Sequence, residues 1–167
     1  MIKPSILTAL NAQIQHELSS AHAYRAVSLY FGLLNLRGLE SFMARQAQEE
    51  RMHAEKFICH LAARGGQADL GALPTPVATF ASVMAAVDAV HDWECATTDK
   101  IHRLFDLARR EGDYALEVLL HWFVAEQVEE EQWSGELAAL TGQFHERPAE
   151  LFMLDHQWGK RVEEKAL

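Results

Sequence analysis

The stretch Ala47-Gln48-Glu49-Glu50-Arg51-Met52-His53 places a glutamate and a histidine three residues apart within a segment of helical periodicity. Residues three apart lie on one face of an α-helix, so Glu50 and His53 can bind the same ion. A lone glutamate followed by a polar pair with this spacing occurs twice, at an offset of 77 residues: first Glu17, Glu50 and His53, then Glu94, Gln127 and Glu130. The repeat predicts two metal ions related by a pseudo-twofold axis.

Four long segments around these residues repeat apolar side chains every three or four positions, which is typical of amphipathic helices. Ser5 is suited to cap the first helix and Asp113 the fourth, because their side chains can accept hydrogen bonds from backbone N–H groups. Gly65-Gly66 and Gly142 are expected at the ends of the second and fourth helices. We expect helices at about 5–34, 38–64, 82–110 and 113–141, and a shorter fifth helix at 148–158.

The segment from Gly65 to Ala81 lacks clear periodicity and contains two prolines. A helix of about 28 residues is roughly 42 Å long, whereas seventeen extended residues reach about 56 Å. The segment can therefore run the full height of a bundle and make the second and third helices parallel. A flexible linker between two domains is the alternative. However, neither half could bury its seam, the row of side chains at every third or fourth position of each helix, well alone. We predict an all-α fold with one domain over residues 1–167, a four-helix bundle with one long crossover and a short fifth C-terminal helix.

The middle layer of every helix seam is polar, although seam positions of a bundle point at the core. Burying one unpaired ion costs several kcal/mol, whereas a whole domain is stable by only about 5–15 kcal/mol. No Lys or Arg occupies a seam position at that level. Arg51 and Arg103 are nearby in the sequence but lie outside the inward-facing positions. A cation from outside the chain is therefore expected. Four carboxylates, one imidazole and one amide favour iron or manganese over zinc, calcium or magnesium.

The composition is that of a folded, acidic protein of 167 residues. Hydrophobic residues make up 49% and charged residues 23%, which argues against disorder. The net charge of −9 favours cations and disfavours nucleic acid as a partner. The chain has no run of eighteen apolar residues that would predict a membrane span, and no signal peptide is evident. Cys59 and Cys95 are isolated and expected as reduced thiols, so we predict a cytoplasmic protein.

The chain resembles the bacterial non-haem ferritins in Glu17, in the stretch 47–53, in Glu94 and in the run Glu126-Gln127-Val128-Glu129-Glu130-Glu131. The likeness covers nearly the whole chain and implies the ferritin-like fold. It implies one iron held by Glu17, Glu50 and His53, and a second held by Glu50, Glu94 and Glu130, with Gln127 beside the pair. It also implies a third, more labile iron held by Glu49, Glu126, Glu129 and Glu130.

The same resemblance implies an iron-storage protein with ferroxidase activity. Fe(II) would be oxidised at the paired sites by O2 or H2O2 and stored as a hydrated Fe(III) oxide mineral inside a hollow homo-oligomer of 24 copies. In the resembled family a tyrosine and a tryptophan lie near the two irons and can supply electrons, and Tyr24 and Trp122 occupy these positions. The other tryptophans are expected in the core or in subunit contacts.

Two related classes remain as alternatives. A bacterioferritin carries Glu-x-x-His in both halves and a haem-binding methionine directly after the bridging glutamate. In this chain the second pair is Gln127-x-x-Glu130 and Arg51 follows Glu50, so haem is not expected. A ferritin-like di-iron peroxidase or oxygenase without mineral storage is the second alternative, although 167 residues leave little room for a substrate pocket or a reductase surface.

Overall fold

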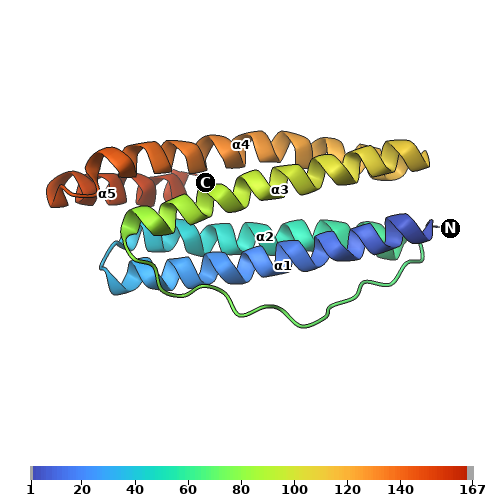
Figure 1. Cartoon of the computed structure of the whole chain (residues 1–167), viewed down its shortest axis with the longest axis horizontal. Coiled ribbons are helices and arrows are strands. Elements are labelled where there is room, and N and C mark those ends of the chain that lie inside the picture. The colour runs from blue at the N-terminus through green and yellow to red at the C-terminus, as the bar shows by residue number, and fades with distance from the viewer. Residues whose placement is uncertain (1, 165–167) are drawn as a thin grey trace.

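The computed structural model describes residues 2–164 and contains five α-helices and no strand within that range (Figure 1). This arrangement confirms the predicted all-α class. The helices are α1 (Pro4–Leu33), α2 (Arg37–Ala63), α3 (Val83–Glu111), α4 (Tyr114–Phe144) and α5 (Pro148–Glu164). None of the helices between residues 2 and 164 is both long and apolar enough to cross a membrane.

The four long helices form a bundle of two antiparallel hairpins, α1 with α2 and α3 with α4 (Figure 1). The segment between α2 and α3 runs along the outside of the bundle from one end to the other, so α2 and α3 point in the same direction (Figure 1). Asn11 and Gln15 of α1 hold this crossover, because their side chains donate to the carbonyl oxygens of Gln67 at 3.3 Å and Asp69 at 3.0 Å. The Asn11 Oδ1 atom also accepts from the Asp69 N–H group at 2.7 Å.

Two of the long helices begin with a side-chain cap of the kind that the sequence favours. The Asp113 side chain accepts a hydrogen bond from the Leu116 N–H at 3.1 Å and caps α4, as predicted. Ser82 caps α3 in the same way through the Ala85 N–H. The prediction of Ser5 as a cap was wrong, because α1 begins at Pro4, where a proline costs no hydrogen bond, and Ser5 lies within the helix.

Two helices extend beyond their predicted ends. Gly65 and Gly112 adopt positive φ angles of 73° and 65° at the ends of α2 and α3, but Gly142 does not and α4 continues to Phe144. The fifth helix continues past Trp158 to Glu164. Its extension follows from packing, since Trp158 is fully buried and Arg161 pairs with Glu136 of α4 at 2.8 Å.

The bundle interior consists of two apolar clusters separated by a polar layer. One cluster lies toward the α5 end and includes Val27, Phe31, Leu39, Met43, Val87, Val90, Leu137 and Trp158. The other lies toward the opposite end and includes Ile6, Leu10, Ile14, Phe57, Leu61, Ile101, Leu116 and Leu120. The six polar residues that the 77-residue repeat singled out are buried along the same helices between these clusters.

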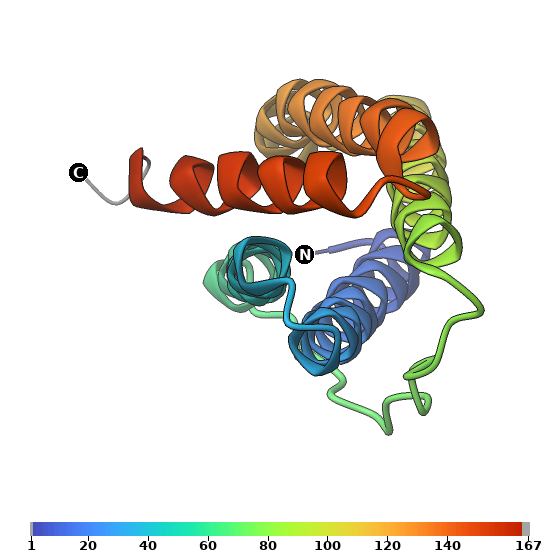
Figure 2. The same cartoon turned by 90° about the vertical axis from the view of Figure 1, so that its left-hand side faces the viewer.

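Helix α5 follows α4 in the chain but packs mainly on α2 (Figure 2). The Asp155 carboxylate accepts a hydrogen bond from the Leu39 N–H at 2.8 Å and satisfies a free donor in the first turn of α2. Backbones approach closely here, because a Cβ atom on Gly38 would lie 1.8 Å from the Asp155 carbonyl oxygen. The contact is therefore specific to glycine at position 38 and fixes α5 to the other half of the bundle.

Candidate metal centre

The six residues of the repeat are all buried, and each is between 1% and 4% exposed. They come from all four long helices: Glu17 from α1, Glu50 and His53 from α2, Glu94 from α3, and Gln127 and Glu130 from α4. The described residues place no Lys or Arg in a hydrogen bond or ion pair with any of these four carboxylates. The polar layer thus contains buried acid groups without a basic partner.

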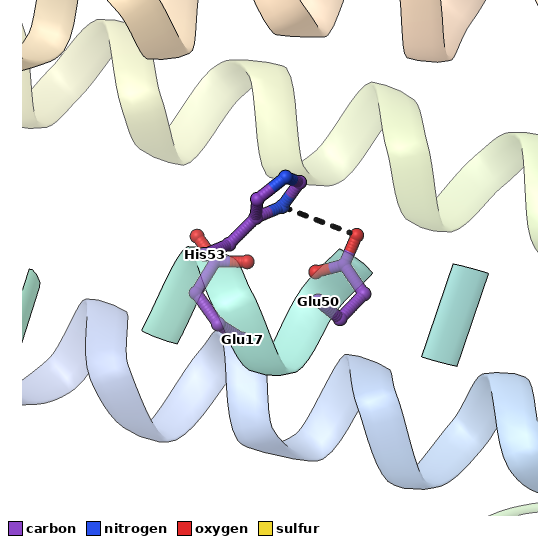
Figure 3. A group of neighbouring side chains, drawn as sticks. All are labelled: Glu17, Glu50 and His53. Carbon is purple, nitrogen blue, oxygen red and sulfur yellow. Dashed lines mark ion pairs between the residues drawn. The ribbon is translucent and has the colours of Figure 1, made fainter. Parts of the chain in front are cut away.

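Three of the residues form a close cluster. One ligand atom each from Glu17, Glu50 and His53 lies within 4.8 Å of the others, and His53 Nδ1 lies 3.6 Å from Glu50 Oε1 (Figure 3). Gln13, one turn before Glu17, donates to Glu17 Oε1 at 2.7 Å. The remaining oxygens, Glu17 Oε2 and Glu50 Oε2, are buried and find no hydrogen-bond partner within residues 2–164. Two unsatisfied carboxylate oxygens beside an imidazole fit a divalent transition-metal ion well.

The second half of the layer is arranged differently, because donors of the protein occupy its carboxylates. The Tyr24 hydroxyl donates to Glu94 Oε1, and Gln127 Nε2 lies 3.4 Å from Glu94 Oε2. Glu130 Oε2 accepts from the Trp133 indole N–H and from Gln46 Nε2, the latter at 3.2 Å. Within residues 2–164 these groups form no second cluster as close as the first. The sequence repeat therefore produces two chemically unequal halves.

Burial raises the pKa of every carboxyl group in the layer. The pKa values of Glu17 and Glu130 lie well above the ordinary value because of burial first and then because of neighbouring carboxylates, Glu50 and Glu94 respectively. The same two causes raise the pKa of Glu50, with Glu94 as the main neighbour. Burial raises the pKa of Glu94 to about 7, although the bond from Tyr24 opposes this shift. A metal ion that binds these carboxyl groups would therefore displace their protons.

Three of the four residues predicted for a third ion lie around one cavity. A cavity of about 460 Å³ between α2, α4 and α5 is lined by Glu49, Glu129 and Glu130, together with Trp133 and both arginines of the nearby ion pairs. Glu49 is paired with Arg45 at 2.7 Å, and Glu129 is exposed. Glu126 does not line the cavity. The structure therefore brings together the predicted third set only in part.

Tyr24 and Trp122 lie on opposite sides of the layer. Tyr24 is fully buried, and burial together with the Glu94 carboxylate raises its pKa well above the ordinary value. The Trp122 ring meets the His53 ring edge to face at 5.5 Å, and Lys56 Nζ lies 4.2 Å above it. Trp122 is 38% exposed, so it connects the layer to the surface.

Three residues that contact the centre were not predicted from the sequence. Gln13 precedes Glu17 by four positions, Gln46 precedes Glu50 by four, and Trp133 follows Glu130 by three. These spacings place each residue one helical turn from a predicted ligand, which is the signal that could have identified them. Trp133 donates to Glu130 from the same helix, and Gln46 donates to it from α2.

Comparison with known proteins places this geometry in a family. Residues 7–143 match the Ferritin-like domain. The bacterial non-heme ferritins of Staphylococcus aureus strain USA300 and Staphylococcus saprophyticus are 36% and 37% identical to the chain over 131 residues, covering 78% of it and 79% and 78% of those proteins.

Solved structures agree with the sequence relatives. An open pore ferritin from the archaeon Archaeoglobus fulgidus superposes with a TM-score of 0.92 at 35% identity, covering 95% of this chain and 98% of that chain. A humanized archaeal ferritin gives a TM-score of 0.93 at 34% identity, with 95% and 96% covered. The resemblance to bacterial non-haem ferritins and the ferritin-like fold class are thereby confirmed. The chain belongs to the ferritin family.

Proposed function

We propose that this protein is an iron-storage ferritin that oxidises Fe(II) at a di-iron ferroxidase centre in each chain. The observation that carries the proposal is the close cluster of Glu17, Glu50 and His53, with two buried carboxylate oxygens that lack partners, inside a chain of the ferritin family. The names of its relatives, non-heme ferritins and a ferritin with an open pore, support the same function. Iron is the substrate and the stored material in this proposal.

We assign the first Fe(II) to Glu17, Glu50 and His53 and the second to Glu50, Glu94 and Glu130, with Gln127 beside them. The second position requires Glu130 to present Oε1, because its Oε2 accepts bonds from Trp133 and Gln46. It also requires Glu94 to give up a hydrogen bond, because its two oxygens accept from Tyr24 and from Gln127. A third ion is assigned to Glu49, Glu126, Glu129 and Glu130. Occupation of this third position requires Glu49 to leave its ion pair with Arg45.

The chemistry follows from charge. Anionic oxygen ligands stabilise Fe(III) more than Fe(II), so the carboxylates of the layer make the loss of an electron easier. Two Fe(II) ions each give one electron to O2, which takes up two protons and becomes H2O2, and H2O2 can accept two electrons from the next pair. The carboxyl groups with raised pKa values release protons when the ions bind and can supply them locally. Tyr24, whose hydroxyl donates to Glu94, is assigned as a source of a further electron, and so is Trp122.

We assign storage to a shell of 24 copies, with no haem, in the cytoplasm. Large apolar side chains are exposed at the end of α1, on the crossover and on α4, where contacts between copies would cover them, including Leu33, Leu70, Val77, Val118 and Val128. A shell of 24 chains of 18.8 kDa has a mass of about 450 kDa. Light scattering at low micromolar concentration should report that mass, whereas a monomer or dimer would contradict the shell.

One experiment separates storage from the related oxygenase and peroxidase activities. Fe(II) is added in air in steps, ferric absorbance is followed, and the iron retained per chain is counted after gel filtration. A storage protein should retain far more iron than its binding sites can hold. Retention of only two to three ions per chain would identify a di-iron oxygenase or peroxidase instead and would refute the storage proposal.

A further inference from the structure

Glu130 is held by two hydrogen-bond donors on the same oxygen. The Trp133 indole N–H and Gln46 Nε2 both donate to Glu130 Oε2, whereas no donor within residues 2–164 reaches Oε1. A carboxylate oxygen has two lone pairs, so two donors use the hydrogen-bonding capacity of Oε2. Only Oε1 remains free for an ion. The two donors therefore favour attachment through one oxygen over attachment through both.

The direction of the Trp133 N–H is fixed by aromatic packing. Its ring meets Phe42 of α2 at a centroid distance of 5.0 Å and Trp158 of α5 at 6.1 Å, in both cases edge to face. A third neighbour, Tyr24 of α1, lies at 6.4 Å. Edge-to-face pairs of this kind stabilise a ring beyond the burial of its area. Rotation of the indole would break contacts with three other helices.

Helix α5 supplies one of these contacts and is itself firmly docked. Trp158 is fully buried and also packs against Phe42 at 4.7 Å. The Arg161 guanidinium lies 4.1 Å above the Trp158 ring and binds both oxygens of Glu136 at 2.8 Å. A continuous path of contacts thus leads from α5 through Trp158 and Trp133 to Glu130.

We propose that Trp133 is a positioning residue that restricts Glu130 to binding the second ion through Oε1 alone, and that α5 holds Trp133 in this position. The inference rests on the proposed function only in taking Glu130 as a ligand of that ion. A single attached oxygen keeps the coordination number of the second ion low. The C-terminal helix consequently contributes to the geometry of a centre that it does not touch.

Anaerobic titration with Co²⁺, followed by its visible absorption bands, tests the inference without any turnover. Trp133→Phe keeps an aromatic ring and removes the N–H, so Glu130 can attach through both oxygens. We expect weaker Co²⁺ bands, because a higher coordination number lowers their intensity, and an affinity of the second ion that falls by about 10–100-fold, as is usual for outer partners of metal ligands. The first ion, at Glu17, Glu50 and His53, should bind as before.

Trp93→Phe is the matched control. Trp93 also packs against Tyr24, at 6.3 Å, but within residues 2–164 its indole makes no hydrogen bond to a carboxylate of the layer. This variant should leave the Co²⁺ spectrum and both affinities unchanged. If Trp133→Phe folds poorly, Gln46→Met removes the other donor and should change the spectrum in the same direction by a smaller amount.

The outcomes distinguish the inference from the proposed function. If the wild-type protein binds two Co²⁺ ions per chain and Trp133→Phe gives an unchanged spectrum and affinity, the positioning role is refuted. If Trp158→Leu, which leaves both donors in place, gives the wild-type spectrum, the contribution of α5 is refuted. If the wild-type protein binds no Co²⁺, the di-iron assignment fails first.

Discussion

The two halves of the bundle carry the same pattern of polar residues, but their carboxylates differ in hydrogen bonding. In the α1–α2 half, the ligand atoms of Glu17, Glu50 and His53 lie within 4.8 Å of one another, and two carboxylate oxygens are left without a partner. In the α3–α4 half, Glu94 and Glu130 accept hydrogen bonds from other side chains of the protein. The first half leaves buried acceptors without partners, whereas the carboxylates of the second half are hydrogen-bonded within the protein.

This difference indicates an order of binding. An unsatisfied buried acceptor costs about 1–3 kcal/mol, so an ion at the first half removes a penalty that the folded chain carries. An ion at the second half must instead compete with Tyr24 and Gln127 for the oxygens of Glu94, and at Glu130 it finds only Oε1 free. We therefore expect the first position to fill first and more tightly.

Removing one carboxylate from each half should have the largest effect. Glu50→Ala with Glu130→Ala deletes the residue that we assign to both ions and one that we assign to the second ion. Initial Fe(II) oxidation should slow by more than the ~100-fold that outer partners of metal ligands produce, since direct ligands are lost. Without metal, the double variant should be at least as stable as the wild type, because it removes buried like charges. Stopped-flow ferric absorbance and thermal melts with chelator measure these two quantities.

The control for this pair removes Glu55 and Glu117, which lie on the same two helices but outside the layer. Glu55→Ala with Glu117→Ala should oxidise iron at the wild-type rate. Unchanged initial rates in the Glu50 and Glu130 variant would remove the assignment of the centre to this layer.

The stability of the metal-free protein should fall as pH rises. A carboxyl group whose pKa is raised on folding binds its proton more tightly in the folded state, so its contribution is full below pH about 4.5 and is lost as pH rises through the folded pKa. For Glu94, with a folded pKa of about 7, the loss amounts to about 3 kcal/mol. Glu17, Glu50 and Glu130 have pKa values shifted in the same direction and add to it.

Urea unfolding with chelator at several pH values between 5 and 8 measures this slope. Stabilisation by added Co²⁺ should show the opposite sign and grow with pH, because the ion binds the ionised carboxylates. A metal-free protein whose free energy of unfolding is flat over this range would contradict the burial of ionisable acids in the layer.

A further carboxylate in the second half should make it more like the first. Gln127→Glu replaces the amide that donates toward Glu94 and Thr98 with a carboxylate that cannot donate when ionised. Without metal this should cost about 1–3 kcal/mol of stability, the usual penalty for an unsatisfied buried group. With two ions per chain it should tighten the second ion. Chemical unfolding and calorimetric titration of the same samples should therefore change in opposite directions, and a parallel change would contradict the role assigned to Gln127.

The smallest expected effect concerns Tyr24. Tyr24→Phe removes the donor to Glu94 and leaves the ring in place, so stability should fall by about 1 kcal/mol. The bond from Tyr24 lowers the pKa of Glu94, so the variant should raise that pKa further and move binding of the second ion to higher pH. Tyr30→Phe, on the same helix and away from the layer, is the control. Equal behaviour of the two variants would show that the bond to Glu94 is unimportant.

The fold and the first half of the centre could be predicted because they depend on local periodicity. A seam repeated every three or four residues determines which side chains share a face, and Glu17, Glu50 and His53 lie on such faces. The length of α5 could not be predicted, because it depends on packing of Trp158 against Phe42 of α2 and Trp133 of α4. The different hydrogen bonding of the two halves could not be predicted either. It depends on whether Trp133 and Gln46 point at Glu130, which the spacing allows but does not determine.

Because the crossover lies on the outside of the bundle, we expect the fold to persist after cleavage of the backbone in this segment. Most side chains between Gly66 and Ser82 are exposed, and the segment contributes nothing to the polar layer. A protease acting there would separate the chain into two hairpins, each with half of the buried acids. The C-terminal helix belongs to the second hairpin by connectivity but docks on the first through Asp155 and Gly38. The two pieces would consequently stay associated after the peptide bond between them is lost.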